Sequence, residues 1–173
     1  MTDTYTKYDF SLAIITICKD NPKDLLRSLT SIANQNQLPD EVIIIDGSST
    51  SNECKRISSS FNSYSPRVYH QQGKGVYEAM NQGLQHARKE WVFFLNSGDV
   101  FHDTTVLEKA RKQLNNELAN ALAGPVIVRR KRNERVQNPD IANGYMHHQG
   151  IFYRKRVHDS LGLYATARGL TAA

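Results

Sequence analysis

The chain has 173 residues, of which 39% are hydrophobic, so it is long enough for one domain with a buried core. Its longest apolar stretches, at residues 12–18 and 42–45, are far shorter than the roughly 20 residues that cross a bilayer, and we expect no membrane-spanning segment. A net charge of +5 and a pI of about 9.2 favour anionic partners, which include nucleotide diphosphates, phospholipid surfaces and nucleic acids.

The N-terminus and the cysteines bear on the compartment. Residues 1–10 are polar and mixed in charge and lack the basic start and apolar run of a secretory signal peptide, so we expect a cytoplasmic protein. Cys18 and Cys54 have no close metal-type spacing and no oxidising context. We interpret both as free thiols.

The first third of the sequence has the pattern of a strand–helix–strand unit. Residues 12–17 and 41–45 are nearly continuous runs of β-branched apolar residues, which is typical of parallel strands buried on both faces. Between them, Asn21 and Pro22 mark a helix start, and apolar residues recur at helical spacing until Leu38 and Pro39 end the pattern.

Alternation of strands and helices continues beyond this unit. A short strand at 67–70 precedes the segment Gly73-Lys74-Gly75, a helix follows from about 76 to 89, and a buried strand at 91–95 ends in the polar turn 96–99. This order predicts an α/β fold with a largely parallel sheet and right-handed crossovers.

The remainder of the chain changes character. The spacing is helical from Asp103, a candidate N-cap, to about residue 120, and residues 121–130 and 150–153 read as strands separated by a polar segment. Residues 48–65 are rich in serine and asparagine, and either a helix with poorly packed flanks or a flexible loop fits them.

A basic run at residues 129–132, followed by Arg135, is the densest cluster of positive charge. One interpretation is a solvated hairpin tip, and the other is attraction to anionic lipid headgroups, which would give peripheral membrane association. Because no aromatic residues interleave with the run and no zinc or helix-turn-helix signature is present, we expect no nucleic-acid partner.

Polar residues that follow the apolar runs are the best candidates for function, since ligands of open α/β sheets bind at the carboxyl ends of the strands. Asp46 follows the second strand and Asp99 ends the turn after residues 91–95. One carboxylate can accept hydrogen bonds from a base or ribose, and another can hold a divalent cation against a diphosphate. Each could equally cap a helix or shape a turn.

Glycine-rich phosphate-binding motifs are missing from the sequence. No Gly-x-Gly-x-x-Gly follows the first strand and no Gly-x-x-x-x-Gly-Lys-Ser/Thr occurs, which argues against dinucleotide-type and P-loop binding. A metal or basic side chains would then have to neutralise phosphates, and Lys74, between two glycines, can supply such a charge; alternatively it is an ordinary exposed lysine.

Five segments together resemble bacterial family 2 glycosyltransferases of the exopolysaccharide and colanic-acid type. They are residues 14–17 (IITI), 41–49 (EVIIIDGSS), 73–83 (GKGVYEAMNQG), 94–99 (FLNSGD) and 148–154 (HQGIFYR), and the resemblance extends over about 11–164. It implies a single GT-A domain over 1–173, with a mixed, largely parallel sheet flanked by helices. A nucleotide-sugar-binding half would occupy about 11–100 and a partial acceptor half about 101–173.

The resemblance also implies an activity: metal-dependent, inverting transfer of a hexose from a UDP- or GDP-sugar to a lipid-linked surface-polysaccharide acceptor. The residues that it assigns to the donor are Thr16, Asp46, Lys74, Asn81 and Asn96. Asp99 would bind Mg²⁺ or Mn²⁺ that bridges the diphosphate. Because Asn96 and Gly98 stand where the family commonly has acidic residues, we expect weak metal affinity.

His148 and Gln149 complete the set of residues that the resemblance assigns. It places them near the metal, the phosphates or the acceptor. A strand-edge pair with one inward ring is the other interpretation.

The resemblance leaves the catalytic residue unassigned. Relatives follow the segment equivalent to residues 162–164 with a short stretch that leads to an aspartate, so the expected base would come directly after Ala173. A fragment, a truncated gene and a short natural form are the three explanations we consider. The alternative function is therefore a non-catalytic module that binds nucleotide sugars. A sugar nucleotidyltransferase is disfavoured because its glycine-rich, arginine-containing loop is missing after the first strand.

Overall fold

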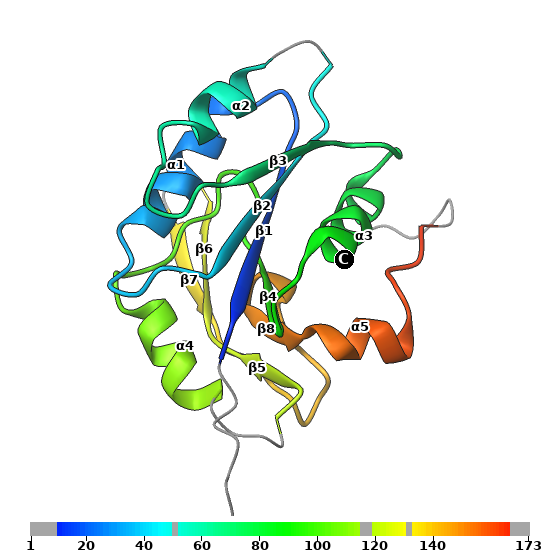
Figure 1. Cartoon of the computed structure of the whole chain (residues 1–173). Coiled ribbons are helices and arrows are strands. Elements are labelled where there is room, and N and C mark those ends of the chain that lie inside the picture. Colours follow the sequence, from blue (N-terminus) through cyan, green and yellow to red (C-terminus); the bar gives the residue numbers. More distant parts are fainter. Residues whose placement is uncertain (1–9, 50–51, 115–118, 131–132, 167–173) are drawn as a thin grey trace, which may run out of the picture.

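The computed structural model describes residues 10–49, 52–114, 119–130 and 133–166 (Figure 1). The strands are β1 (Leu12–Cys18), β2 (Glu41–Asp46), β3 (Arg67–His70), β4 (Trp91–Phe94), β5 (Ala121–Ala123), β6 (Val126–Arg130), β7 (Asn133–Gln137) and β8 (Ile151–Arg154). The helices are α1 (Pro22–Ala33), α2 (Glu53–Ser58), α3 (Val76–His86), α4 (Val106–Leu114), α5 (Lys155–Leu161) and the 3-10 turn η1 (His148–Gly150).

Six strands form one mixed sheet in the order β3-β2-β1-β4-β8-β5. The first four run parallel to one another, while β8 is antiparallel to β4 and β5 is antiparallel to β8. This arrangement confirms the α/β fold with a largely parallel sheet flanked by helices. β6 and β7 form a separate two-stranded hairpin.

Helices cover both faces of the sheet because β1 and β2 are apolar on both faces. One face packs against apolar residues of α1, α2 and α4, and the other packs against those of α3 (Figure 1). Side chains alternate along β1, so Ile14 belongs to the first of these two cores and Ile15 to the second. No helix in the described part of the chain is long and apolar enough to cross a membrane.

The helix starts follow the expected capping chemistry. Asn21 caps α1 by accepting a hydrogen bond from the Asp24 amide (3.3 Å), and Pro22 occupies the first helical position, where a missing N–H costs nothing. Asp103 precedes α4 and accepts hydrogen bonds from the Thr105 amide (2.7 Å) and hydroxyl (2.6 Å). α4 comprises Val106–Leu114, and residues 115–118 of the predicted helix lie outside the described chain.

The predicted strand over 121–130 is in fact two strands that belong to different sheets. Gly124 and Pro125 separate β5 from β6, and Gly124 donates a backbone hydrogen bond to Gly150 (2.8 Å) before the chain leaves the main sheet. Proline has no N–H to continue a ladder, which explains the break. In the serine-rich segment at 48–65, residues 53–58 form α2. The predicted hairpin at the basic run exists, although residues 131 and 132 of its turn lie outside the described chain.

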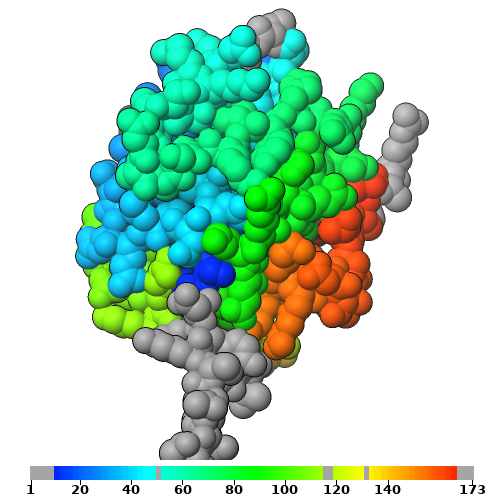
Figure 2. Space-filling view, viewed as in Figure 1, coloured from blue at the N-terminus to red at the C-terminus, as the bar shows by residue number. Residues whose placement is uncertain are grey.

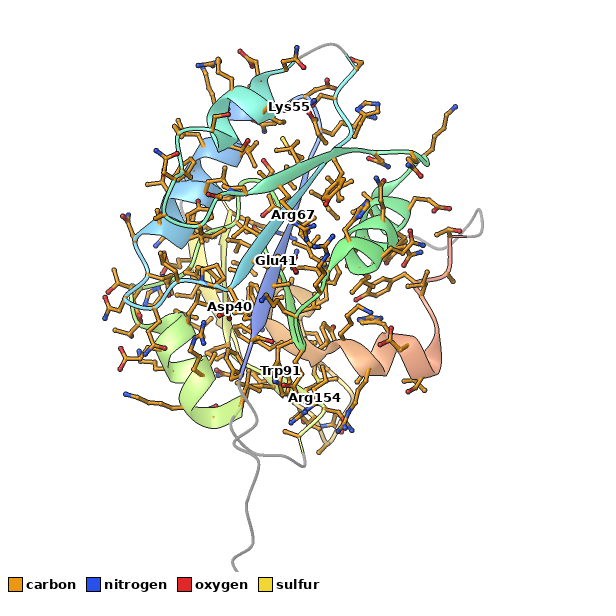
Figure 3. The ribbon with its side chains drawn as sticks, viewed as in Figure 1. Asp40, Glu41, Lys55, Arg67, Trp91 and Arg154 are labelled. Carbon is orange, nitrogen blue, oxygen red and sulfur yellow. The ribbon has the colours of Figure 1, made fainter. Side chains whose placement is uncertain are left out.

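A buried arginine fastens the antiparallel strand β8 to the parallel part of the sheet. Arg154 pairs with Glu90, donates to the Ala119 carbonyl (2.7 Å) and lies over the Trp91 ring, with 4.8 Å between its guanidinium carbon and the ring centroid (Figure 3). Its side chain is only 6% exposed. The side-chain contacts of Arg154 therefore add to the backbone ladder that joins β8 to β4.

Candidate functional site

A cleft of about 800 Å³ opens at the carboxyl ends of the parallel strands. Its lining comes from four chain segments: Ile17, Lys19 and Asn21 at and after the end of β1; Gly47, Ser48 and Ser49 after β2; His70, Gln71, Gly73, Lys74, Gly75 and Val76 from the end of β3 to the start of α3; and Asn96 and Ser97 after β4. A smaller hollow of about 260 Å³ lies at the other end of the sheet, where Glu41 and Arg67 pair with each other. We therefore place the candidate site in the larger cleft.

Hydrogen bonds between the loops after β1 and β2 build one wall of the cleft. The Asp20 amide donates to Ser48 Oγ (2.9 Å), and the Ser49 amide donates to an Asp20 carboxylate oxygen (3.2 Å). Asp20 has a positive φ of 51°, a conformation that aspartate tolerates better than most residues. The wall is thus preformed by side chains that face the neighbouring loop.

Asp46 lies beneath this wall rather than on its surface. Its carboxylate is 7% exposed, accepts a hydrogen bond from the Ser48 amide (3.0 Å) and contacts the Cys54 thiol. The three residues that line the cleft after β2 follow Asp46 directly. Asp46 is therefore placed to fix the shape of this loop.

Residues between β3 and α3 form the opposite wall. Gln71 donates to the Gly75 carbonyl (2.9 Å), and Gly75 has a φ of 101°, which turns the chain into α3. The free amides of the first turn of α3 adjoin this wall, and Lys74 is exposed beside them. Backbone amides and an ammonium group are donors that can bind an anion, and the Glu78 side chain of the same turn lies against Gly73 and reduces the net positive charge of this wall.

Asp99 lies at the turn after β4. Ser28 holds the turn, since its hydroxyl accepts from the Gly98 amide (2.9 Å) and donates to the Asp99 carbonyl (2.8 Å). Within the described residues no hydrogen bond engages the Asp99 carboxylate, which is half-buried. Burial raises its pKa, and the neighbouring His147 and Arg27 partly offset that rise.

The segment before β8 brings further polar atoms to this turn. His147 lies within electrostatic range of Asp99, its ring stacks on that of His148 with centroids 5.9 Å apart, and η1 packs beside β4. Burial, followed by the charge of His147, lowers the pKa of His148. In the described structure, Asn96 Oδ1, His147 Nδ1 and Gln149 Oε1 are buried without a hydrogen-bond partner. Such atoms are normally satisfied, so they mark a place where a ligand or water supplies the missing bonds.

The described residues suit a divalent cation only if a bound diphosphate supplies some of its ligands. Among the described residues, no three histidine, cysteine, aspartate or glutamate side chains lie close enough together to hold a metal ion. Asp99 nevertheless offers a carboxylate with no competing hydrogen bond, and Mg²⁺ commonly binds through one or two carboxylates together with substrate phosphates. The arrangement thus suits a cation that arrives with a diphosphate.

The residues predicted from the sequence differ in how they lie relative to the cleft. Lys74 and Asn96 line the cleft, and Asp46 and Asp99 lie behind residues that line it. Thr16 is fully buried, and because side chains alternate along β1 it points away from the face on which Ile17 lines the cleft. His148 and Gln149 belong to η1, next to β4.

Asn81 has a different partner from the one predicted. Both ends of its carboxamide bond the main chain of Tyr164: its nitrogen donates to the carbonyl (2.9 Å) and its oxygen accepts from the amide (2.9 Å). The residue is 7% exposed and does not line the cleft. It thus joins α3 to the chain that follows α5, which the red and green surfaces in Figure 2 show in contact.

The sequence analysis gave no role to several residues that line the cleft, including His70 and Gln71. Each follows or ends a strand, so the rule that strand ends carry ligands would have found them. Nothing in the residue types themselves separates them from ordinary turn residues.

Comparison with known proteins places this geometry in a family. The model of "Glycosyl transferase family 2" matches residues 13–168. A PGL/p-HBAD biosynthesis glycosyltransferase of Mycobacterium tuberculosis is 28% identical over 147 residues, which are 79% of this chain and 56% of the relative. An uncharacterized glycosyltransferase of Haemophilus influenzae is 26% identical over 93 residues, which are 53% of this chain and 35% of the relative.

Solved structures share the fold. S. aureus TarS 1–349 has a TM-score of 0.70 at 18% identity, with 88% of this chain and 49% of that chain covered. The mannosyltransferase PcManGT from Pyrobaculum calidifontis, solved with GDP-Man and Mn²⁺, has a TM-score of 0.72 at 19% identity, with coverage of 92% and 48%. The chain spans about half the length of the proteins it matches. On the match over residues 13–168, the chain belongs to glycosyl transferase family 2.

Proposed function

We propose that this chain binds a nucleotide-diphosphate sugar in the cleft at the strand ends and serves the transfer of its sugar to an acceptor. The observation that carries the proposal is the pairing of a wall that offers donors, made by Lys74 and the start of α3, with the turn that bears Asp99. Family membership supports it. So do the names of two fold neighbours, TarS solved with UDP-GlcNAc and PcManGT solved with GDP-Man.

The donor would divide between the two walls. The nucleoside would lie against the loops after β1 and β2, above Asp46, and the diphosphate would face Lys74 and the first turn of α3. Asp99 would hold Mg²⁺ or Mn²⁺ against the diphosphate, where a cation stabilises the negative charge of the departing nucleoside diphosphate. PcManGT, whose structure contains Mn²⁺, supports that choice of ion.

The partly buried polar atoms beside β4 suit the sugar. Asn96 Oδ1 and Gln149 Oε1 are acceptors that lack partners, and sugar hydroxyls are donors. His147 and His148 adjoin Gln149 in the chain, and in this proposal the cluster faces the acceptor. In this proposal residues up to about 100 bind the donor, and the residues after them form part of the acceptor half.

The proposed acceptor is a lipid-linked oligosaccharide of a surface polysaccharide, and transfer proceeds with inversion. Inverting displacement requires a base that takes the proton of the acceptor hydroxyl. The resemblance of residues 148–164 to exopolysaccharide enzymes supports this acceptor class, as does the basic hairpin β6–β7, which suits peripheral contact with an anionic membrane at its cytoplasmic face. The alternative is a module that binds the donor without transferring its sugar.

Thermal unfolding in the presence of UDP-, GDP-, CDP- and dTDP-sugars, each with and without Mn²⁺, tests donor binding. A ligand at one hundred times its Kd stabilises the native state by about 2.7 kcal/mol, so one nucleotide class should raise the melting temperature clearly. Asp99→Asn should abolish the contribution of Mn²⁺, whereas Asp159→Asn, which changes an exposed carboxylate on α5, should not. Absence of a shift with every nucleotide would refute the proposal.

Transfer itself separates the enzyme from the binding module. Sugar transfer to a lipid-linked acceptor should be measured for this chain and for a version extended through the expected aspartate. If only the extended version transfers, the chain by itself is the donor-binding part. Equal turnover by both would show that no base beyond residue 173 is required.

A further inference from the structure

Gln71 follows β3 at the cleft, and its main chain is fixed on two sides. Its amide donates to the Asp46 carbonyl (2.8 Å), which continues the parallel ladder between β2 and β3. On the other side, Gln82 of α3 donates to the His70 carbonyl (2.8 Å) and accepts from the Gln72 amide (3.0 Å). The segment that carries Gln71 is therefore held between the loop after β2 and α3 (Figure 1).

The Gln71 side chain has a defined orientation in the cleft. Its Nε2 atom donates to the Gly75 carbonyl (2.9 Å). Because a carbonyl oxygen can only accept, the amide nitrogen must face Gly75 and Oε1 must face away from it. Oε1 lies against Gly47 of the loop after β2, and Gly47, Gln71 and Gly75 all line the cleft. The carboxamide thus bridges the two walls.

Glycine at position 47 makes room for this carboxamide. A Cβ atom there would overlap Gln71 Oε1 and would lie 3.4 Å from Gln71 Cδ. The backbone itself does not call for glycine, since Gly47 is not among the glycines with a positive φ. The absence of a side chain at Gly47 therefore sets the place of the Gln71 oxygen.

The carboxamide keeps unused hydrogen-bonding capacity. Within the described chain Gln71 Oε1 accepts no hydrogen bond, and the bond to Gly75 uses only one of the two hydrogens on Nε2. The side chain therefore offers a ligand one acceptor with one donor beside it, in an order that the bond to Gly75 fixes. A matching ligand presents a donor beside an acceptor.

We propose that Gln71 determines the nucleotide specificity of the donor site, by selecting a base that presents a ring N–H beside a carbonyl oxygen, as uracil and guanine do. The ring N–H donates to Oε1, and Nε2 donates to the carbonyl of the base. Cytosine and adenine present an unprotonated ring nitrogen beside an amino group. To bond them the carboxamide would have to turn over, which would place Oε1 against the Gly75 carbonyl. This inference rests on the proposed function, in which the nucleoside lies against the loop that contains Gly47.

Pairs of nucleotides that differ only in the base isolate this contact. UDP and CDP share the ribose and the diphosphate, as GDP and ADP do, so contacts with the metal and the phosphates cancel within a pair. Titration calorimetry of the unaltered chain with Mn²⁺ should show a preference of about 10- to 100-fold for UDP over CDP or for GDP over ADP, the range for one amide that bonds a base edge twice. A preference for CDP or ADP would overturn the proposal.

Gln71→Ala and Gln72→Ala form a matched pair of variants. Gln71→Ala should remove most of the preference by weakening the binding of UDP or GDP. Gln72→Ala should keep it, because Gln72 is exposed and is not among the residues that line the cleft. An equal loss of affinity for both members of a nucleotide pair in Gln71→Ala would indicate a contact with the ribose or the phosphates and would contradict recognition of the base.

Gly47→Ala tests whether the acceptor acts from its observed place. The added methyl group should displace only the end of the Gln71 side chain, so thermal unfolding without ligand should change little while the base preference falls as in Gln71→Ala. In the double variant the two losses should not add, because both act on one carboxamide. Additive losses would show that the methyl group blocks the ligand by itself and would contradict the role given to Gly47. If Gly47→Ala does not fold, Gln71→Ala still decides.

Failure of this inference and failure of the donor site give different results. If none of the four nucleotides binds, the donor site fails, and the role of Gln71 fails with it. If all four bind with the same affinity, the donor site stands and only the role of Gln71 is wrong.

Discussion

The parallel strands β1 to β4 and the chain from residue 119 onward are built in different ways. β1, β2 and β4 are buried almost throughout, with helices on both faces. In the later region β5 to β8 are short, and large apolar side chains such as Ile141 (71%) and Leu161 (84%) are exposed. The first region has its own core, and the second is joined to it by the β4–β8 ladder, by Phe152 in that core and by a few side-chain contacts.

That difference explains where each region should be sensitive to substitution. A residue of the first region is surrounded by apolar atoms, so its removal leaves a cavity. A residue of the second region matters mainly if it touches the first, as Arg154 and Tyr164 do. The clearest tests of the comparison lie at those junctions.

Trp91→Ala should have the largest effect on stability. Trp91 is 1% exposed, stacks on Phe10 with ring centroids 6.1 Å apart and carries the Arg154 guanidinium on its ring. Its truncation should lower the free energy of unfolding by about 3–5 kcal/mol, measured by urea denaturation.

Leu161→Ala is the matched control in the second region. Because Leu161 is 84% exposed, its truncation should change the free energy of unfolding by no more than about 0.5 kcal/mol. Similar losses of unfolding free energy in the two variants would show that the second region has a core of its own and would contradict this difference between the regions.

Asn81→Leu should have an intermediate effect. It removes both hydrogen bonds to the Tyr164 main chain and leaves partly buried backbone groups unsatisfied, at a cost of about 1–3 kcal/mol in the free energy of unfolding. Hydrogen exchange of the Tyr164 amide should also accelerate.

Gln82→Leu is the matched control, because it removes two hydrogen bonds of α3 that do not involve Tyr164. Gln82 is equally buried and bonds the Gln72 amide (3.0 Å) and the His70 carbonyl (2.8 Å), both within the first region. It should cost a similar amount of stability and leave exchange at Tyr164 unchanged. Equal acceleration at Tyr164 in the two variants would mean that Asn81 has no special role in attaching the later chain.

The sequence predicted the first region better than the second, for a physical reason. Strands buried on both faces must be apolar at every position, so residues 12–17 and 41–45 reveal β1 and β2 directly. β6 and β7 carry exposed polar residues. The chain passes from the main sheet to the second sheet at Pro125, between β5 and β6, and composition alone does not reveal this change.

The candidate site, like the fold, could be predicted from the sequence only in part. Sequence position at strand ends located Lys74 and Asn96 on the cleft, because parallel strands end at one edge of the sheet. The two bonds from Asn81 to Tyr164 join residues 83 positions apart. Such long-range pairs depend on how helices settle on the sheet, and no local pattern encodes them.

Lys74→Gln should have a smaller effect, confined to ligand binding. Lys74 is exposed, so its attraction to a bound diphosphate should be worth about 0.2–1 kcal/mol, measured as a weaker affinity for the nucleotide that the thermal screen identifies. The difference from the unaltered protein should shrink as salt rises, because ions screen exposed charges. Lys112→Gln, on α4 outside the cleft, is the control; an equal loss there would indicate a general charge effect.

Asp103 gives the smallest predicted effect, and it depends on pH. Hydrogen bonds from the Thr105 hydroxyl and amide lower the pKa of this carboxyl to about 2. Because the pKa is lower in the folded than in the unfolded chain, the carboxylate stabilises the start of α4 fully above the unfolded value of about 4, and this contribution disappears as pH falls toward 2. Asp103→Ala should therefore be slightly less stable than the unaltered chain at pH 6, with the gap closing at pH 3, when urea midpoints are compared. A gap that stayed constant across this range would mean that Thr105 bonds the side chain without favouring its charged form.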